Sequence, residues 1–337
     1  MSDLQTTIKD PIDYEQDGRQ IAHLLLPHSP HSDAWGTIAI PIAMLKNGSG
    51  PTVLLVGGNH GDEYEGPITI AKLAREFDPA LLQGRLIMLP ALNTPAVMAA
   101  SRTSPLDGLN LNRCFPGDAF GSATQQIVYY LAHRLYPMAD LIMDLHSGGS
   151  SLEMLPSGIV EPAADPARFE SNLDAVLTFD APFSIIHANP GDPRTSTATA
   201  VRLGKTIVGS ELGSGGAVSI EGLRACERGI KNVLASLGMI DPALRLPPFE
   251  RRTRLLRAMG YEAHVYAPEA GVFEPFHELG ALVEAGDVAG LVHFLDDPAR
   301  PPVAAHFERG GIVFSRRAPG RCVRGSCLAV VGAEETT

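Results

Sequence analysis

The sequence predicts an α/β fold with a doubly wound, mostly parallel sheet, followed by a smaller all-β domain at the C-terminus. Hydrophobic residues make up 45% of the 337 residues, which is enough to bury a large core. Short apolar runs alternate with helix-period segments up to about residue 240, as in α/β proteins. Beyond the double proline Pro247-Pro248, strand-like runs separated by Gly/Pro turns replace that alternation.

The predicted strands are continuous apolar runs, as expected for a sheet that is covered on both faces. They span residues 19–27, 37–44, 51–58, 84–92, 139–146, 182–188 and 205–212. The predicted helices carry apolar residues three and four positions apart and span residues 66–77, 123–135, 164–177 and 219–238. We therefore expect two domains, residues 1–245 and residues 246–337, and we expect the second to act as a cap or packing domain.

The charge balance argues against several classes of partner. Acidic residues outnumber basic ones by 38 to 27, so a nucleic-acid or anionic-membrane surface is not expected. No apolar run approaches the roughly 18–20 residues that cross a bilayer, and residues 1–18 do not resemble a signal peptide. The four cysteines form no CxxC pair. We expect a cytoplasmic protein, and a homo-oligomer stays open.

The first chemical motif follows the predicted strand 51–58, in the stretch GGNHGDEYEG. His60 and Glu63 provide an imidazole and a carboxylate, which are both zinc ligands, on a loop that lies at the carboxyl end of a strand. An isolated H-x-x-E is more often an ordinary polar loop with a helix-capping carboxylate. The interpretation therefore depends on other residues.

A second motif, DLHSGG, ends the predicted strand 139–146. His146 is expected at the same sheet edge as His60 and Glu63, and these three would form an open zinc site with a fourth position for water. The alternative is a core histidine that is satisfied by a backbone carbonyl. Asp144 is a candidate partner for His146, although we expect it to point to the opposite face of the strand.

The third motif, SELGSGG, places Glu211 at the end of the predicted strand 205–212. A carboxylate at this edge can reach a water without ligating the metal, so general base and acid is its natural role. The alternative is a carboxylate that stabilises the N-terminus of the following helix.

The long loop SRTSPLDGLNLNRCFPG lies between predicted elements and is rich in polar residues. Arg113 beside Asn112 could bind a substrate carboxylate, and Arg102 could stabilise a carbonyl oxygen as charge develops on it. Surface arginines that neutralise nearby aspartates are the alternative. Glu153 and Asp192 are candidates for binding a substrate ammonium, although solvated loop charges are the better explanation for both.

Together the four motifs resemble the succinylglutamate desuccinylase/aspartoacylase family, relatives of the zinc carboxypeptidases, over about residues 50–240. The resemblance implies a zinc carboxypeptidase-like fold and one Zn²⁺ per chain, held by His60, Glu63 and His146. It further implies that Glu211 is the catalytic acid and base, that Arg102 polarises the carbonyl, and that Asn112 and Arg113 bind the α-carboxylate. The substrate would be a small N-acyl amino acid. Within the family, the motifs are most similar to those of deacetylases of N-alpha-acetyl-L-2,4-diaminobutyrate.

The sequence leaves three other functions open. They are a deacylase of another N-acyl amino acid, of the aspartoacylase or succinylglutamate desuccinylase type, a metallocarboxypeptidase, and a non-catalytic module that binds a metal or an amino acid. The two enzyme alternatives would use the same residues. Glu211 argues against the binding module, because binding alone needs no base.

Overall fold

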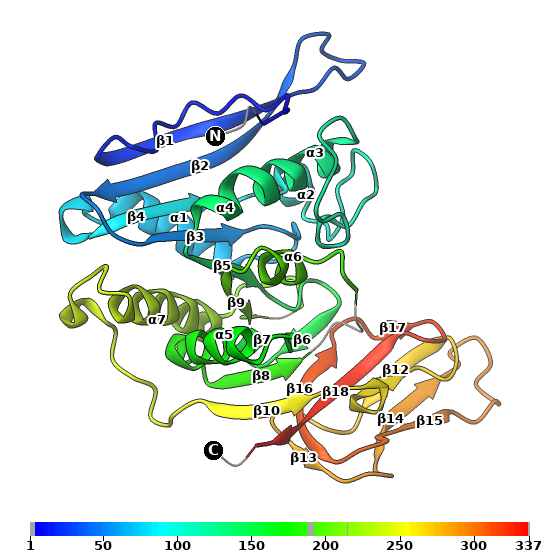
Figure 1. The fold of residues 1–337 in the computed structure, drawn as a ribbon. Helices are drawn as coiled ribbons and strands as arrows, with labels where there is room; N and C mark the ends of the chain where they lie inside the picture. The colour runs from blue at the N-terminus through cyan, green and yellow to red at the C-terminus, as the bar shows by residue number, and fades with distance from the viewer. Residues whose placement is uncertain (1–3, 188–191, 214, 336–337) are drawn as a thin grey trace.

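A computed structural model describes residues 4–187, 192–213 and 215–335. Its main sheet has fourteen strands in the described residues, and twelve of them follow the order β1-β2-β4-β3-β5-β9-β7-β8-β10-β18-β16-β13 (Figure 1). Strands β4, β3, β5 and β9 pair in parallel, as do β7, β8 and β10. Antiparallel pairs lie at both ends and also in the middle, where β7 pairs with β9, so the sheet is mixed and the expected mostly parallel arrangement was wrong. The predicted α/β class with a smaller C-terminal β region is confirmed.

Every strand and helix predicted between residues 19 and 238 is present with shifted ends. The strands of this part are β1 Gly18–Pro27, β2 Thr37–Asn47, β3 Thr52–Gly57, β4 Gly84–Leu89, β5 Leu141–His146, β6 Leu152–Met154, β7 Ser157–Val160, β8 Phe183–His187 and β9 Thr206–Glu211. The α-helices are α1 Glu65–Glu76, α2 Thr94–Ala99, α3 Ala123–Tyr130, α4 Tyr136–Met138, α5 Pro166–Phe179, α6 Ser196–Arg202 and α7 Ile220–Ser236. A π-helix, Leu131–Leu135, joins α3 to α4. Strands β6 and β7 and helices α2 and α6 are short, and the apolar pattern did not predict them.

The central strands are apolar throughout because both of their faces are buried. In β3, Val53 and Leu55 pack in a core with helices α1, α5 and α7, while Leu54 and Val56 pack in a second core with α3 and α6. Successive side chains of a strand point to opposite faces, so one continuous apolar run fills both cores. The sheet is therefore covered on both sides, as a doubly wound fold requires.

The C-terminal part consists mainly of short strands. They are β10 Arg254–Ala258, β11 His264–Tyr266, β12 Gly271–Pro275, β13 Leu282–Val283, β14 Val288–His293, β15 Val303–His306, β16 Gly311–Arg317, β17 Arg321–Cys322 and β18 Cys327–Glu334. Four of them form a separate antiparallel sheet in the order β15-β14-β12-β17. Strand β10, in contrast, extends the main sheet by pairing in parallel with β8. The division into residues 1–245 and 246–337 stays a prediction, and a continuous sheet crosses that boundary.

The C-terminal strands also contact the loop that follows His146. Strand β16 pairs with β6, and Arg316 forms an ion pair with Glu153 at 2.6 Å. This pairing sets the C-terminal region beside the carboxyl ends of the central strands (Figure 1). None of the described helices is long and apolar enough to cross a membrane.

Candidate active site

Three adjacent parallel strands bring the predicted site residues to one edge of the main sheet. Strand β3 leads into the loop that carries His60 and Glu63, while β5 ends at His146 and β9 ends at Glu211. Strand β5 lies between the other two, and His146 is the direct register partner of Glu211. The expected convergence at the carboxyl ends of these strands is therefore confirmed.

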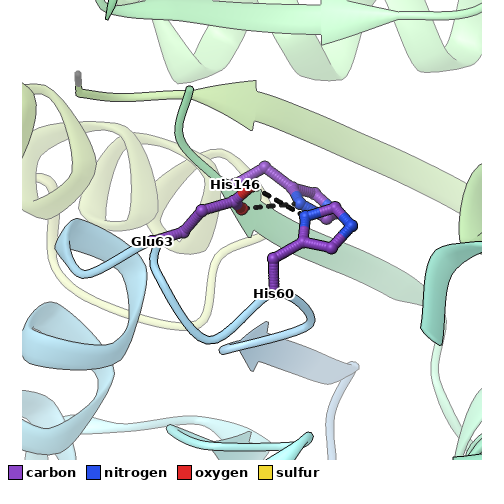
Figure 2. A group of neighbouring side chains, drawn as sticks. All are labelled: His60, Glu63 and His146. Atoms are coloured by element: carbon purple, nitrogen blue, oxygen red, sulfur yellow. Dashed lines mark hydrogen bonds and ion pairs between the residues drawn. The ribbon is translucent and has the colours of Figure 1, made fainter. Parts of the chain in front are cut away.

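His60, Glu63 and His146 form a buried cluster, in which one ligand atom of each residue lies within 4.8 Å of the other two. The Glu63 carboxylate lies between the two rings, with Oε1 at 2.7 Å from His60 Nδ1 and Oε2 at 2.9 Å from His146 Nδ1 (Figure 2). The ring centroids are 5.0 Å apart. Two imidazole nitrogens and a carboxylate oxygen at these separations are a donor set that fits one divalent cation.

The other ring nitrogen of each histidine points to an oxygen acceptor. His60 Nε2 lies 3.1 Å from Asn110 Oδ1, and His146 Nε2 lies 3.1 Å from Asp144 Oδ2. An amide or carboxylate oxygen accepts a hydrogen bond, so these contacts favour a proton on Nε2 and leave the Nδ1 lone pair for a metal. The contacts at Nε2 therefore favour the tautomer that a metal bound at the two Nδ1 atoms would require.

Charges inside the cluster also favour a cation. Burial by itself opposes the charged form of Glu63, but the imidazoles of His60 and His146 bring the pKa of this carboxyl well below its usual range. Burial likewise opposes charge on His146, yet the carboxylates of Asp144 and Glu63 raise the pKa of its imidazole well above the ordinary value. The two carboxylates thus stabilise a positive charge on the imidazole, and a metal bound at Nδ1 would take the place of the proton there.

The expectation that Asp144 points away from His146 was wrong. Residues two apart on an extended strand share a face, and both side chains accordingly lie on the same side of β5. Asn110 was part of the predicted loop but had no predicted role. Its contact with His60 spans 50 positions of sequence, so no local pattern could reveal it.

Two further carboxylates tie the ligand loops together. Asp62 Oδ2 accepts hydrogen bonds from the backbone N–H and the hydroxyl of Ser150, at 2.8 and 2.7 Å. Glu65 accepts from the Ser147 hydroxyl at 2.6 Å and from the Ser219 N–H at 2.7 Å, next to helix α7. Gly61 allows the first loop to lie against α2, since a Cβ atom there would come within 2.0 Å of the Ala96 backbone. These contacts fix the loops relative to one another.

Glu211 lies beside the cluster with one oxygen uncommitted. Its Oε2 is buried and has no hydrogen-bond partner among the described residues. Burial, and then the neighbouring Glu63 carboxylate, raise the pKa of Glu211 to about 8. A carboxyl group of this kind can hold a proton near neutral pH and exchange it with a reactant, which is what a general acid or base must do.

The predicted arginines and asparagine lie on the other side of the cluster. Arg102 is partly exposed, and its Nη1 lies 3.4 Å from Glu63 Oε1. Asn112 Oδ1 accepts a hydrogen bond of 2.8 Å from the Ser196 N–H, which positions this loop against helix α6. Arg113 donates to the Asn112 carbonyl at 2.7 Å and lies 3.4 Å from Asp192.

All seven predicted site residues line a single cavity of about 360 Å³. The C-terminal region contributes five lining residues, which are His264, Phe314, Ser315, Cys327 and Val330. The two candidate ammonium-binding carboxylates do not line this cavity. Glu153 pairs with Arg316, and Asp192 pairs with Arg194 at 2.9 Å. The alternative explanation, a loop charge, fits both of them.

Comparisons with known proteins agree with this geometry. Residues 49–237 match the succinylglutamate desuccinylase/aspartoacylase catalytic domain family. The chain is 38% identical over 324 residues, 96% of its length and 94% of the relative's, to the N-alpha-acetyl-L-2,4-diaminobutyric acid deacetylase of Halomonas elongata.

Two solved structures resemble the whole chain. A succinylglutamate desuccinylase/aspartoacylase from Rhodobacter sphaeroides is 42% identical, with a TM-score of 0.93 and coverage of 98% of this chain and 100% of that one. The product-bound ectoine utilization protein EutE (DoeB) from Ruegeria pomeroyi is 38% identical, also with a TM-score of 0.93, and covers 97% and 99%. The chain therefore belongs to the succinylglutamate desuccinylase/aspartoacylase family and carries its catalytic domain.

Proposed function

We propose that this protein is a zinc-dependent amidohydrolase that removes the acetyl group from N-alpha-acetyl-L-2,4-diaminobutyrate, a step of ectoine degradation. The observation that carries the proposal is the convergence of His60, Glu63 and His146 with Glu211 in one cavity. The 38% identity to a protein named as this deacetylase, over almost the full length of both chains, supports the choice of substrate.

The cluster of His60, Glu63 and His146 would hold the metal through two Nδ1 atoms and a carboxylate oxygen. When bound there, zinc supplies a Lewis acid that makes water more acidic and an amide carbonyl more electrophilic. Asn110 and Asp144 keep both rings in the ligating tautomer. The chain thus provides a preorganised site instead of one assembled on binding.

The remaining side chains would carry the proton and the substrate. Glu211 accepts a proton from the attacking water and later donates it to the departing amine, so that acetate and free 2,4-diaminobutyrate result. Arg102 donates hydrogen bonds to the carbonyl oxygen as negative charge develops on it. Asn112 and Arg113 hold the α-carboxylate and so fix the amide beside Glu211.

The size of the cavity favours a small substrate. Its volume of about 360 Å³ suits an acyl amino acid, and residues of strands β16 and β18 form part of its wall. A metallocarboxypeptidase would need an open groove on this side.

A substrate panel tests the proposal. Acetate or succinate release is measured from N-alpha-acetyl-L-2,4-diaminobutyrate, N-acetyl-L-aspartate, N-succinyl-L-glutamate and a blocked dipeptide, with zinc and after chelation and dialysis. We expect the first compound to have the highest kcat/KM and zinc to restore the activity that chelation removes. Preference for another compound would overturn the assigned substrate, while turnover that withstands complete metal removal would overturn the metal mechanism.

A further inference from the structure

The cavity extends beyond the metal cluster, over the face of the main sheet, and a fourth carboxylate lines it there. Among the described residues, the carboxylates that line the cavity are Glu63, Asp144, Glu211 and Glu161. The first three belong to the metal cluster or to the proton-transfer step. Glu161 immediately follows strand β7 and has no part in either.

Strand register sets the distance between Glu161 and the reaction centre. Ser157 is the register partner of Glu211, and Glu161 lies four positions further along the chain. At about 3.3 Å per residue, the backbone of Glu161 is therefore offset from that of Glu211 by about 13 Å along the strand direction. Ser157, Ile159 and Glu161 share a face by strand alternation, and Ile159 and Glu161 both line the cavity.

That separation suits a short amino acid with a terminal charge. In N-acetyl-2,4-diaminobutyrate the acetyl carbonyl carbon and the side-chain nitrogen are five bonds apart, roughly 6 Å when extended. The rest of the distance is spanned by the two glutamate side chains and their contacts with the substrate. A substrate whose amide lies beside Glu211 can therefore place its side-chain nitrogen beside Glu161.

Two histidines line the cavity next to Glu161, and both have a fixed tautomer. His187 Nδ1 lies 2.9 Å from the Ala258 carbonyl, and His264 Nδ1 lies 3.1 Å from the Gly260 carbonyl. Because a carbonyl oxygen can only accept, Nδ1 carries the proton in each ring, and in the neutral ring Nε2 is an acceptor. Burial lowers the pKa of His187, which keeps this imidazole neutral. The ring centroids of the two histidines are 5.6 Å apart.

The charges around this part of the cavity are arranged for a zwitterion. Glu161 lies close enough to Arg113 for its charge to act on that guanidinium. Arg113 can take the α-carboxylate while Glu161 takes a positive group a few bonds away. Ile159, Phe314 and Val330 line the same cavity and provide an apolar wall for the connecting methylene groups.

We infer that Glu161, with Nε2 of His187 and His264, forms the subsite that binds the side-chain ammonium of the substrate. An ammonium has three N–H donors, and this subsite offers a carboxylate and two imidazole acceptors. The inference rests on the proposed function and adds the residues that select a cationic side chain. It replaces the earlier candidates Glu153 and Asp192.

A pair of substrates tests it, namely N-acetyl-L-2,4-diaminobutyrate and N-acetyl-L-2-aminobutyrate, which lacks the ammonium but keeps the carbon chain. In Glu161→Gln, kcat/KM for the first compound should fall about 10- to 100-fold, as expected when a hydrogen-bonded ion pair with the substrate is lost. For the second compound it should change less than about threefold. Metal content should be unchanged, and Glu170→Gln, on the exposed side of α5, is the matched control.

His264→Phe provides an independent variant, because it keeps a ring in the cavity but removes the acceptor. It should lower kcat/KM for the ammonium substrate about 3- to 10-fold and spare the other compound. If wild type prefers the ammonium substrate and both variants keep that preference, the subsite is wrong while the proposed function stands. If wild type shows no such preference, the proposed substrate itself is wrong. Equal losses on both compounds would also overturn the subsite, since they would indicate a general structural effect.

Discussion

The two regions that enclose the cavity contribute different kinds of residue. The α/β region supplies His60, Glu63, His146, Glu211 and the arginines, and most of these are held by hydrogen bonds from several loops. The described lining residues of the C-terminal region include no carboxylate, lysine or arginine. Under the proposed function, the first region would provide the reacting groups and the second would shape the cavity. Substitutions in the first should therefore affect turnover, and those in the second should affect substrate binding and stability.

The largest effect is expected for His60→Ala, which removes one of the two proposed imidazole ligands. Metal should be lost and kcat/KM should fall on the order of 10⁴-fold or more, because water and carbonyl are then no longer activated. Elemental analysis and acetate release measure the two effects. His23→Ala, on the exposed surface of β1, is the control and should keep both. A variant of position 60 with full metal content and activity would contradict the assigned ligand set.

Glu211→Gln should separate metal binding from proton transfer. The amide cannot accept the proton of the attacking water, so kcat should fall about 10²- to 10⁴-fold. Metal content should stay at the wild-type level, since Glu211 is not part of the ligand cluster. Single-turnover kinetics together with elemental analysis provide the measurement. Nearly normal kcat would exclude Glu211 from the mechanism.

Arg102→Ala should have a smaller effect and lower kcat about 10²- to 10³-fold, as for the loss of one oxyanion donor. The expected loss lies mainly in kcat, because the charge on the carbonyl oxygen develops only in the transition state. Steady-state kinetics distinguish this from a binding defect. An increase in KM alone would instead place Arg102 in substrate binding. Arg75→Ala, at the exposed end of α1, provides the control.

The smallest effect tests the C-terminal side. Arg316→Ala removes the ion pair between β16 and Glu153, so the free energy of unfolding should decrease by about 0.2–1 kcal/mol. KM should increase a few-fold while kcat stays within about twofold, because the wall of the cavity loosens but the reacting groups do not move. Urea unfolding and steady-state kinetics measure these changes, with the exposed Arg324→Ala as control. A large loss of kcat would contradict the proposal that the C-terminal region shapes the cavity without taking part in the reaction.

Local sequence predicted the fold class and the main strands, and it singled out seven candidate site residues that the structure places around one cavity. Apolar runs report strands that are buried on both faces, and polar motifs directly after such runs must lie at the sheet edge. His60, Glu63, His146 and Glu211 were therefore predictable, because each belongs to a short motif next to a strand end. The family resemblance added the expected roles but not the geometry.

Tertiary structure decided most of the residues that support those seven. Asn110 contacts His60 across 50 positions of sequence, whereas Asp144 lies two residues before His146 and was already a candidate partner. Glu161, His187 and His264 line one cavity because β7 lies between β8 and β9, while β10 and β11 bring the C-terminal region alongside. Such contacts join segments far apart in the chain, whose register is set by packing. A one-residue shift in a strand would turn each side chain to the other face, so local sequence cannot specify them.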